Sequence, residues 1–347
     1  MNFLKPKRLR QGDVVAVLSP SWGGPSKYPH VFDLGLRNLE SLFGLRVKEY
    51  PTARMDAAEI YSNPRVRAED LNRAFADPEV AGIIASIGGD DSVRILPYLD
   101  LDTILANSKV FMGYSDTAAI NLCLNSKGLV TFNGPSVMAG LANLRYLPPE
   151  ATEFVRGVLF GEDANYCYKP SPAWTDRYVE WSTPEYDGEV TELLPNGGWR
   201  VLQGSGTVEG RLVGGCIEVF EFLKGTRFWP SPEFFRDTIL FFETSEEKPS
   251  VSNVKYMLRN YGSMGVLEGV KAILFGRARS YTDLEKAELE DTVVTVVRQE
   301  FGRPDMPIIA NMDFGHTDPQ WVLPLGVRAR VDCDAPSFCL AERPTSG

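Results

Sequence analysis

The sequence predicts two domains of the α/β class: a doubly wound amino-terminal domain and a β-rich α+β carboxy-terminal domain. Two observations lead to this prediction. The first half alternates short apolar segments with amphipathic ones, which is the pattern of a parallel sheet covered by helices on both faces. At 347 residues the chain also exceeds what one hydrophobic core usually supports, and its 44% of hydrophobic residues is enough to fill two cores.

The expected strands and helices of the first half follow one another in a regular order. The apolar segment 13–21 is followed by the amphipathic segment 31–44, and the same alternation continues up to residue 161. Short apolar runs between amphipathic stretches are typical of parallel strands that are buried on both faces. The further segments are 45–51, 67–78, 80–89, 92–100, 109–115, 116–128 and 150–161.

A change of composition separates the two halves. Residues 168–200 are rich in Pro, Gly, Trp and charged residues and have neither a helical nor a strand period, as expected of a linker or a flap. The predicted organisation is therefore an amino-terminal domain at 1–165, a linker or flap at 166–204 and a carboxy-terminal domain at 205–347.

The second half mixes strands and helices and ends in strands. It begins with the apolar segment 206–215 and an expected helix at 217–226, and the last two segments indicate an antiparallel end that is rich in β structure. The segments between and after these are the strands 238–244, 271–278 and 307–316, the helices 251–262 and 283–302, and the late strands 320–333 and 337–342.

The acidic balance of the chain excludes some classes of partner. The 36 Lys and Arg residues are outnumbered by 46 Asp and Glu residues, which gives a formal charge of −10. Nucleic acids and anionic membranes bind basic surfaces. We therefore expect a small molecule or a peptide as the partner, and neither nucleic acid nor membrane.

Neither a secretory signal nor a membrane span is evident. Gly12 and Asp13 interrupt the first apolar stretch, no small-residue cleavage site follows, and no apolar run approaches the length of a span. The five cysteines are odd in number and lack CxxC spacing, which suits a reducing compartment. These observations predict a cytoplasmic protein with structural thiols at Cys123, Cys167, Cys216, Cys333 and Cys339.

A serine follows one of the expected central strands. Ser115 and Asp116 stand between the apolar residues 110–114 and the helix expected from Thr117 onward. Open α/β sheets place their sites at the carboxyl ends of strands, and the N–H group of Asp116 at the helix start would suit a developing oxyanion. Ser115 is therefore a candidate nucleophile. The alternative is a plain helix cap, because Ser and Asp are both preferred caps and the second glycine of a GxSxG motif is missing.

A glycine pair follows another expected strand. Gly88 and Gly89 end the apolar segment 80–89 and precede an expected helix. Because glycine lets the backbone approach a ligand closely, the N–H group of Gly89 or Asp90 is a candidate second donor to an oxyanion. A phosphate-binding loop is disfavoured, since neither GxGxxG spacing nor a Walker lysine is present.

The sequence contains only two histidines. His30 lies at the expected entry to the first helix, where a capping or surface role is favoured. His316 follows an apolar strand and lies amid Gly and Asp, in the kind of loop where catalytic residues concentrate. A serine nucleophile needs a base that takes its proton, and His316 is the candidate base.

A histidine base needs a carboxylate that fixes its tautomer and stabilises the imidazolium. Glu243 fits this role because it ends an apolar strand before a polar loop. Glu218 and Glu221 are rivals on an expected helix, where glutamates usually form a solvated face. Glu246 and Glu247 are expected to be exposed loop charges.

Neither a metal nor a cofactor is predicted. The two histidines are far apart in the sequence, and HExxH and clustered cysteines are absent. The remaining acidic candidates, Asp90, Asp91 and Asp313, are better explained as turn-forming and capping residues.

Six segments are distinctive when they are taken together: IGGDDSVRILPYLD, KVFMGYSDTAAINL, GLVTFNGPSVM, GRLVGGCIEVFEFLKGT, ILFFET and FGH. In this order, and over most of the chain, they resemble the serine peptidases that comprise the muropeptide LD-carboxypeptidases and the microcin C immunity peptidases. The length of the chain and the form of the first segment are closer to the microcin-immunity branch.

The resemblance implies a Ser-Glu-His triad with Ser115 as nucleophile, Glu243 as orienting acid and His316 as base. It also implies a flavodoxin-like amino-terminal domain that carries the nucleophile, a β-rich carboxy-terminal domain that carries the acid and the base, and a homodimer. Glu243 is thereby preferred over Glu218.

Two features of the sequence concern the substrate pocket of such a peptidase. Cys216 stands where many relatives carry an asparagine. The stretch from Trp174 to Trp181 lies where immunity-type members have a flap that stacks an aromatic ring on a nucleotide. Either tryptophan fits this role, with Trp181 the candidate, and packing of the linker against a domain is the alternative.

An exopeptidase also needs a cation near the carboxylate of its substrate. Arg94, Lys248 and Arg277 are candidates without a ranking among them. Each of the three is equally well explained as a member of a surface ion pair.

The sequence thus predicts a serine carboxypeptidase that hydrolyses a carboxy-terminal amide bond through an acyl-enzyme. The expected substrate is a muropeptide or a microcin C-like peptidyl or aminoacyl nucleotide. The alternative from another class is a non-catalytic two-domain protein that binds a small ligand between its domains, with Ser115 only a cap. A weaker rival is a flavodoxin-like nucleotide-binding domain.

Overall fold

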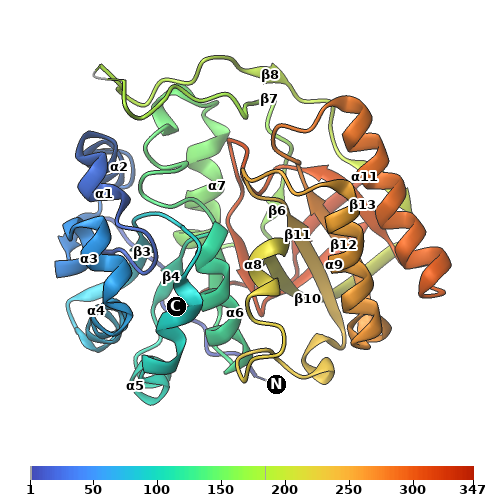
Figure 1. The fold of residues 1–347 in the computed structure, drawn as a ribbon, viewed down its shortest axis with the longest axis horizontal. Helices are drawn as coiled ribbons and strands as arrows, with labels where there is room; N and C mark the ends of the chain where they lie inside the picture. Colours follow the sequence, from blue (N-terminus) through green and yellow to red (C-terminus); the bar gives the residue numbers. More distant parts are fainter. Residues whose placement is uncertain (1, 184) are drawn as a thin grey trace.

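A computed structural model describes residues 2–183 and 185–347. Two sheets lie side by side, one in each half of the chain (Figure 1). Helices of the first half cover one outer flank of the molecule, and α9 (Val251–Ser263) and α11 (Asp283–Thr295) cover the opposite flank (Figure 1). The predicted fold class, an α/β amino-terminal half and a β-rich α+β carboxy-terminal half, is confirmed.

The first sheet has the strand order β14-β5-β4-β3-β1-β2, in which β14 (Leu323–Leu325) comes from the late part of the chain. Its five strands from the first half are parallel and follow the order 2-1-3-4-5, which is the flavodoxin-like arrangement. Four of the five are largely buried, as expected of a sheet covered on both faces, and three of these four are apolar, whereas β2 lies at an edge and is partly exposed. These strands are β1 (Val14–Leu18), β2 (Arg46–Glu49), β3 (Val80–Ala85), β4 (Val110–Met112) and β5 (Thr131–Asn133).

The helices of the first half form where an apolar stripe recurs with the helical period. In α2, Val31, Phe32 and Leu39 point into the core, and Gly44 ends the helix in a left-handed conformation at φ 67°. The helices are α1 (Gly24–Lys27), α2 (Pro29–Phe43), α3 (Ala57–Ser62), α4 (Pro64–Ala76), α5 (Leu101–Ala106), α6 (Ala118–Ser126) and α7 (Glu150–Leu159), with 3₁₀ turns η1 (Pro51–Arg54), η2 (Ser92–Tyr98), η3 (Ser115–Thr117) and η4 (Leu144–Tyr146).

The second sheet has eight strands in the order β6-β16-β15-β10-β11-β12-β13-β9. Its centre is parallel, from β10 to β13, and antiparallel strands flank this centre on both sides. The strands are β6 (Cys167–Tyr168), β9 (Arg200–Gln203), β10 (Thr207–Cys216), β11 (Thr238–Glu243), β12 (Val270–Gly276), β13 (Ile308–Met312), β15 (Arg328–Asp332) and β16 (Ser337–Leu340).

Two helices of the second half are shorter than the sequence indicates. The helix expected at 217–226 ends at Glu221, before the turn that contains Gly225. The helix expected at 283–302 starts with a capping box between Thr282 and Glu285 and passes into a π-helical turn after Thr295. The helices are α8 (Ile217–Glu221), α9 (Val251–Ser263), α10 (Val266–Gly269) and α11 (Asp283–Thr295), with turns η5 (Pro232–Phe235) and η6 (Val296–Glu300).

The segment between the two halves crosses the top of the molecule in the view of Figure 1. It contains a two-stranded ribbon of β7 (Ala173–Trp174) and β8 (Leu194–Pro195). Thr175 is joined to Asp318 by two backbone hydrogen bonds of 2.7 and 2.9 Å. The segment is therefore attached to the loop that follows β13.

Strand β14 (Leu323–Leu325) links the two halves. It comes from the late part of the chain but pairs antiparallel with β5 in the first sheet. The pattern of single strands does not reveal such pairing, because an apolar strand fits the edge of either sheet. The domain boundaries given above stay a prediction.

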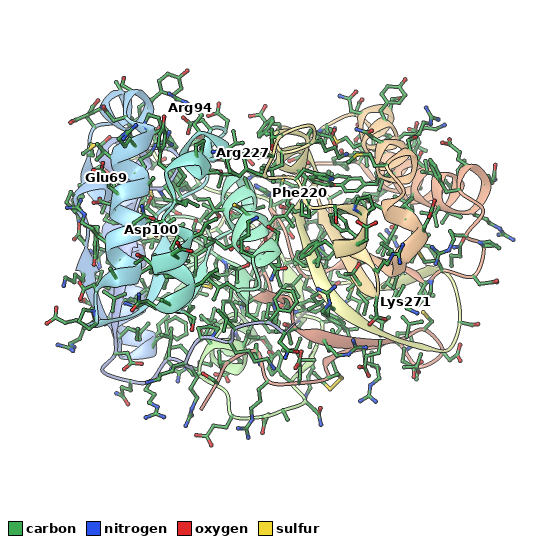
Figure 2. The ribbon with its side chains drawn as sticks, turned by 90° about the horizontal axis from the view of Figure 1, so that it is seen from below. Glu69, Arg94, Asp100, Phe220, Arg227 and Lys271 are labelled. Carbon is green, nitrogen blue, oxygen red and sulfur yellow. A yellow bond between two sulfur atoms is a disulfide. The ribbon has the colours of Figure 1, made fainter. Side chains whose placement is uncertain are left out.

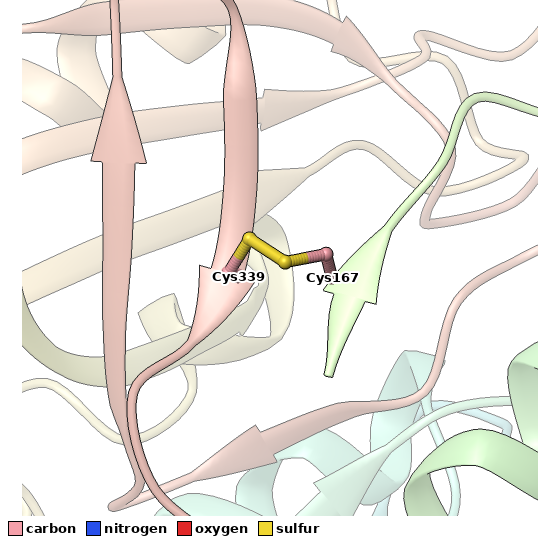
Figure 3. The surroundings of a disulfide bond; sticks show 2 residues. All are labelled: Cys167 and Cys339. Carbon is pink, nitrogen blue, oxygen red and sulfur yellow. A yellow bond between two sulfur atoms is a disulfide. The ribbon is translucent and has the colours of Figure 1, made fainter. Parts of the chain in front are cut away.

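The expectation of five free thiols was wrong for two cysteines. Cys167 and Cys339 lie opposite each other on the antiparallel strands β6 and β16 and form a disulfide, with their Cα atoms 4.0 Å apart (Figure 3). A pairing across 172 positions has no signature in local spacing. Cys123, Cys216 and Cys333 are free and buried.

Candidate functional site

Ser115 lies at the point where β4 ends and the turn η3 leads into α6. Its backbone has φ 58°, a left-handed conformation that is costly for a residue with a side chain. The side chain is partly accessible, although Tyr114 before it and Asp116 after it are buried. The chain therefore presents a hydroxyl at the carboxyl end of a central strand, on a strained turn.

The glycine pair after β3 lies directly against Ser115. A Cβ atom at Gly88 would lie 2.9 Å from Oγ of Ser115 and 3.3 Å from the backbone N of Asp116. Gly89 has φ 150°, and a Cβ atom there would lie 2.3 Å from Oγ of Ser21. A side chain at either position would clash, so both glycines are needed for this close approach.

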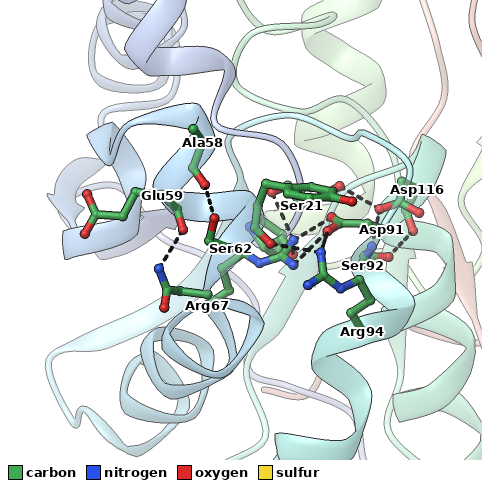
Figure 4. Close-up of polar contacts among 12 residues, drawn as sticks. Ser21, Ala58, Glu59, Ser62, Arg67, Asp91, Ser92, Arg94 and Asp116 are labelled. Carbon is green, nitrogen blue, oxygen red and sulfur yellow. Dashed lines mark hydrogen bonds and ion pairs between the residues drawn. The ribbon is translucent and has the colours of Figure 1, made fainter.

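The carboxylate of Asp116 connects three segments beneath this turn. Its Oδ2 atom accepts hydrogen bonds of 2.6 Å from Oγ of Ser21 and of 2.6 Å from the backbone N of Ser92 (Figure 4). The hydroxyl of Ser92 donates in turn to the carbonyl of Asp116 at 2.7 Å. Burial raises the pKa of Asp116, and these hydrogen bonds oppose the rise. Asp116 is thus more than a helix cap, because it fixes the turn to two neighbouring loops.

An ion pair between Arg67 and Asp91 also fixes these loops. The guanidinium of Arg67 is fully buried and donates to both oxygens of Asp91, at 2.7 and 2.9 Å (Figure 4). Arg67 also donates to the carbonyls of Pro20 and Ser21. A bidentate pair of this kind fixes geometry as well as charge.

The predicted oxyanion donors lie around this turn. The backbone of Gly89 passes beside Ser21, the backbone N of Asp116 faces Gly88, and Asp90 is exposed on the same loop. Their role as oxyanion donors stays a prediction.

Glu243 and His316 meet in the second half. Glu243 is the last residue of β11, His316 lies on the loop after β13, and Oε2 of Glu243 is 2.6 Å from Nδ1 of His316. Both side chains are almost fully buried. Gly315, at φ 102°, permits this contact, because a Cβ atom there would lie 2.7 Å from Cβ of Glu243. The ring of Tyr114 lies 4.9 Å from the ring of His316, so the imidazole lies against the residue that precedes Ser115.

A second carboxylate lies at the other nitrogen of the imidazole. Oε2 of Glu246 is 3.0 Å from Nε2 of His316, close enough for an ion pair but poorly aligned for a hydrogen bond. Burial by itself would lower the pKa of His316, but Glu243 and then Glu246 outweigh it and raise this pKa to about 10. Glu246 was expected to be a plain exposed charge. Its side chain is half exposed, yet it faces the imidazole.

The rival carboxylates have other partners. Glu218 accepts hydrogen bonds from the backbone N and from Oγ of Ser245, at 2.9 and 2.6 Å. Glu221 forms an ion pair with Lys224. Among these glutamates, Glu243 is the one in contact with Nδ1 of His316.

A cleft of about 550 Å³ is lined by Tyr114 and Glu246, which both contact the imidazole of His316. Trp181 lines it and packs edge-on against Tyr28, with ring centroids 5.6 Å apart. Nε2 of His30 lies 2.9 Å from the carbonyl of Trp181, so His30 attaches this segment to α2 rather than capping a helix. Trp174 is instead buried, and the guanidinium of Arg277 lies over its ring, 4.8 Å from the centroid. The cleft is also lined by Trp22, Tyr114, Tyr178, Asp176, Arg177, Glu246, Arg279 and Asp318.

The three predicted cations are not among the residues that line this cleft. Arg94 lies near the edge of the first half and pairs with Asp91 (Figure 2). Lys248 pairs with Glu285 at 2.9 Å. Arg277 is fully buried and pairs with Asp313 at 2.8 Å. The cations that do line the cleft are Arg177 and Arg279.

Sequence reasoning did not single out several residues of this site. Tyr114, Glu246, Arg279 and Asp318 carry no motif of their own, although each is next to or near a residue that was predicted. Burial raises the pKa of Asp318 to about 6. Among the described residues, no group of three or more His, Cys, Asp and Glu side chains is arranged to hold a metal ion.

Known proteins resemble this chain over nearly its whole length. The LD-carboxypeptidase N-terminal domain matches residues 15–134, and the LD-carboxypeptidase C-terminal domain matches residues 209–331. A putative carboxypeptidase of Vibrio cholerae is 30% identical over 342 residues, which cover 98% of each chain. The microcin C7 self-immunity protein MccF of Escherichia coli is 29% identical over 80% of this chain and 78% of its own.

A solved structure extends the likeness to three dimensions. MccF in complex with aspartyl sulfamoyl adenosine superposes with a TM-score of 0.86 at 27% identity, over 99% of this chain and 100% of its own. The relatives support a carboxypeptidase-type hydrolase. The chain belongs to the LD-carboxypeptidase family of peptidases, peptidase family S66, as the resemblance predicted.

Proposed function

We propose that this protein is a serine carboxypeptidase in which Ser115 is the nucleophile, His316 the base and Glu243 the residue that orients the base. The observation that supports it most is the 2.6 Å contact between the buried carboxylate of Glu243 and Nδ1 of His316, with the ring packed against Tyr114. This contact fixes the tautomer in which Nε2 can exchange a proton with a hydroxyl once the half-exposed Glu246 has turned away from it.

In the first step, Oγ of Ser115 bonds to the carbonyl carbon of the substrate while its proton passes to Nε2 of His316. The carbonyl oxygen becomes an oxyanion, which the backbone N–H groups of Asp116 and of Gly89 or Asp90 receive. The carbon–nitrogen bond then breaks, and the proton on Nε2 passes to the leaving nitrogen.

In the second step, water hydrolyses the acyl-enzyme. One proton of the water passes to Nε2 of His316 as its oxygen bonds to the acyl carbon. The ester bond breaks, Oγ of Ser115 recovers the proton, and the acyl group leaves as a carboxylic acid.

The cleft favours an aminoacyl or peptidyl nucleotide over a muropeptide as the substrate. Trp22, Tyr28 and Trp181 give the cleft flat aromatic surfaces, which suit a nucleobase. Arg177 and Arg279 in the same cleft suit an anionic linkage. We place the cation for a substrate anion here rather than at Arg94, Lys248 or Arg277. A homodimer in the cytoplasm remains part of the proposal.

The test uses the purified protein and two substrates, a muropeptide that ends in D-alanine and aspartyl sulfamoyl adenosine. We expect cleavage of the acyl–nitrogen bond of the nucleotide conjugate, and no cleavage by the Ser115→Ala variant. Cleavage of the muropeptide alone would overturn the substrate preference. If neither substrate is cleaved and a fluorophosphonate does not label Ser115, the protein is a two-domain binding protein.

A further inference from the structure

The contact between Glu246 and His316 conflicts with the proposed role of His316 as the base. A base must offer Nε2 to the hydroxyl of Ser115, but Oε2 of Glu246 lies 3.0 Å from this nitrogen. The carboxylate on Nε2 favours an imidazolium, which has no lone pair with which to accept a proton. The carboxylate of Glu246 must therefore leave Nε2 before the reaction starts.

Arg279 is a cation that lines the same cleft as Glu246. In the described parts of the chain its guanidinium has no carboxylate at ion-pair distance, so it is available to a carboxylate that turns toward it. Burial by itself would raise the pKa of Glu246, but His316 and, to a smaller extent, Arg279 outweigh it and lower this pKa to about 2. Glu246 is thus ionised at neutral pH and is attracted by both cations.

The cation is held in place, whereas the carboxylate is free to turn. Arg279 follows β12, and its guanidinium lies over the ring of Tyr178, 4.9 Å from the centroid. The backbone N of the next residue, Ser280, donates a hydrogen bond of 2.8 Å to Oδ2 of Asp176. Glu246 lies on the loop between β11 and α9, with a half-exposed side chain that is poorly aligned for a hydrogen bond to Nε2.

We propose that Arg279 is a positioning residue, which receives the carboxylate of Glu246 in the reacting enzyme and thereby frees Nε2 of His316 for Ser115. The inference rests on the proposed function, since it takes Ser115 and His316 as the nucleophile and the base. Arg279 acts through Glu246 and requires no particular group on the carbon beside the scissile carbonyl. A peptide and an aminoacyl nucleotide both satisfy it.

The turn keeps the carboxylate of Glu246 paired with a cation. An ion pair with the imidazolium is exchanged for one with a guanidinium, which stays charged at every working pH. Once the carboxylate has left Nε2, the pKa of His316 falls, and the extra proton of the imidazolium passes to solvent. A guanidinium has five N–H donors, so Arg279 can hold Glu246 and still face an anionic group of the substrate.

The other groups around the imidazole keep their charge while Glu246 turns. Glu243 is fully buried and stays bonded to Nδ1. Burial raises the pKa of Asp318 to about 6 and raises the pKa of both nearby phenols, so none of these three groups titrates between about pH 7 and pH 10. The charged and titratable groups on this wall are Tyr114, Tyr178, Glu243, Glu246, Arg279 and Asp318.

The experiment measures how fast an uncharged fluorophosphonate labels Ser115 as the pH is raised. An uncharged probe does not need an arginine to bind an anion. At pH 7 we expect Arg279→Met to be labelled about tenfold more slowly than the wild-type protein, or more, with its profile moved by about one unit to higher pH, because Glu246 stays on His316. Arg259→Met removes an exposed arginine of α9 that pairs with Glu300, and should keep the wild-type profile.

A double-mutant cycle tests whether Arg279 acts through Glu246. In Glu246→Gln no carboxylate has to leave Nε2, so the addition of Arg279→Met should change the rate less than about twofold. Arg279→Lys retains a cation and should restore most of the lost rate. If Arg279→Met fails to fold, Arg279→Gln takes its place in the cycle. Equal slowing with and without the carboxylate of Glu246, or no slowing in either case, would overturn the inference.

Failure of this inference differs from failure of the proposed function. Labelling of Ser115 at the same rate in the wild-type protein and in Arg279→Met would overturn the role of Arg279 and leave the peptidase intact. Absence of labelling at Ser115 in the wild-type protein would overturn both.

Discussion

The two halves of the molecule hold their parts of the site in different ways. In the first half, the buried side chains of Asp116 and Arg67 and the largely buried carboxylate of Asp91 are bonded to several neighbours and fix the turn that presents Ser115. In the second half, His316 lies between Glu243, which is buried, and Glu246, which is half exposed. The comparison indicates that the hydroxyl is placed rigidly, whereas the imidazole contacts one carboxylate that is fixed by burial and one that is half exposed.

The largest expected effect is the loss of the hydroxyl itself. Ser115→Ala removes the nucleophile, and we expect kcat for aspartyl sulfamoyl adenosine to fall by about 10⁴-fold or more. Chromatography of the products measures this loss. Ser126→Ala, on the far end of α6, serves as the control and keeps wild-type kcat. Retention of activity in Ser115→Ala would show that the rigid turn has another purpose.

The second largest effect is expected from the loss of the orienting carboxylate of Glu243. Glu243→Gln keeps the shape but removes the charge that stabilises the imidazolium, so we expect kcat to fall by about 10³- to 10⁴-fold. Glu218→Gln is the matched control in the same half, because Glu218 bonds to Ser245 and not to His316. A larger loss for Glu218→Gln than for Glu243→Gln would reverse the assignment.

The ion pair between Arg67 and Asp91 in the first half is expected to contribute to the free energy of unfolding. Asp91→Asn leaves the buried guanidinium of Arg67 without its counter-charge, and we expect the free energy of unfolding to fall by about 3–5 kcal/mol. Urea denaturation followed by circular dichroism measures the change. Arg94→Met removes the more exposed partner of Asp91 and should cost less than about 1 kcal/mol. Equal effects of the two variants would mean that the first half is not held as rigidly as its contacts indicate.

The smallest expected effect is a shift of pH dependence in the second half. The pKa of His316 in the folded protein is raised to about 10. The stability that it contributes is therefore complete below its unfolded pKa of about 6.5 and is lost as the pH rises toward 10. The rate of fluorophosphonate labelling should rise over the same range, because the neutral imidazole is the base. In Glu246→Gln we expect this rise at lower pH. An unchanged pH profile of labelling in Glu246→Gln would show that Glu246 does not raise the pKa of His316.

The sequence allowed the positions of several candidate residues at strand ends to be predicted, for reasons that can be stated residue by residue. Ser115 follows an apolar strand of the first sheet, whereas Glu243 ends and His316 follows apolar strands of the second. The carboxyl ends of parallel strands are where open sheets place their sites. The doubly wound first sheet follows from the alternation of apolar and amphipathic segments, and its flavodoxin-like order was implied by the family resemblance.

Other features depend on contacts between distant segments and could not be predicted. Glu246 looks like any loop glutamate until the fold brings it to His316. Strand β14 is apolar and fits either sheet, and Cys167 pairs with Cys339 only because β6 joins β16 at the edge of the second sheet. The buried pairing of Arg67 with Asp91 likewise has no local signature, since the two residues are 24 positions apart.

The central claim is that the hydroxyl of the first half and the imidazole of the second half act as one unit. Fluorophosphonate labelling, with the modified peptide identified by mass spectrometry, tests it most directly. We expect the label on Ser115 in the wild-type protein and at least about 10³-fold slower labelling in His316→Ala. Labelling of a different residue, or labelling of Ser115 at the same rate without His316, would contradict the account.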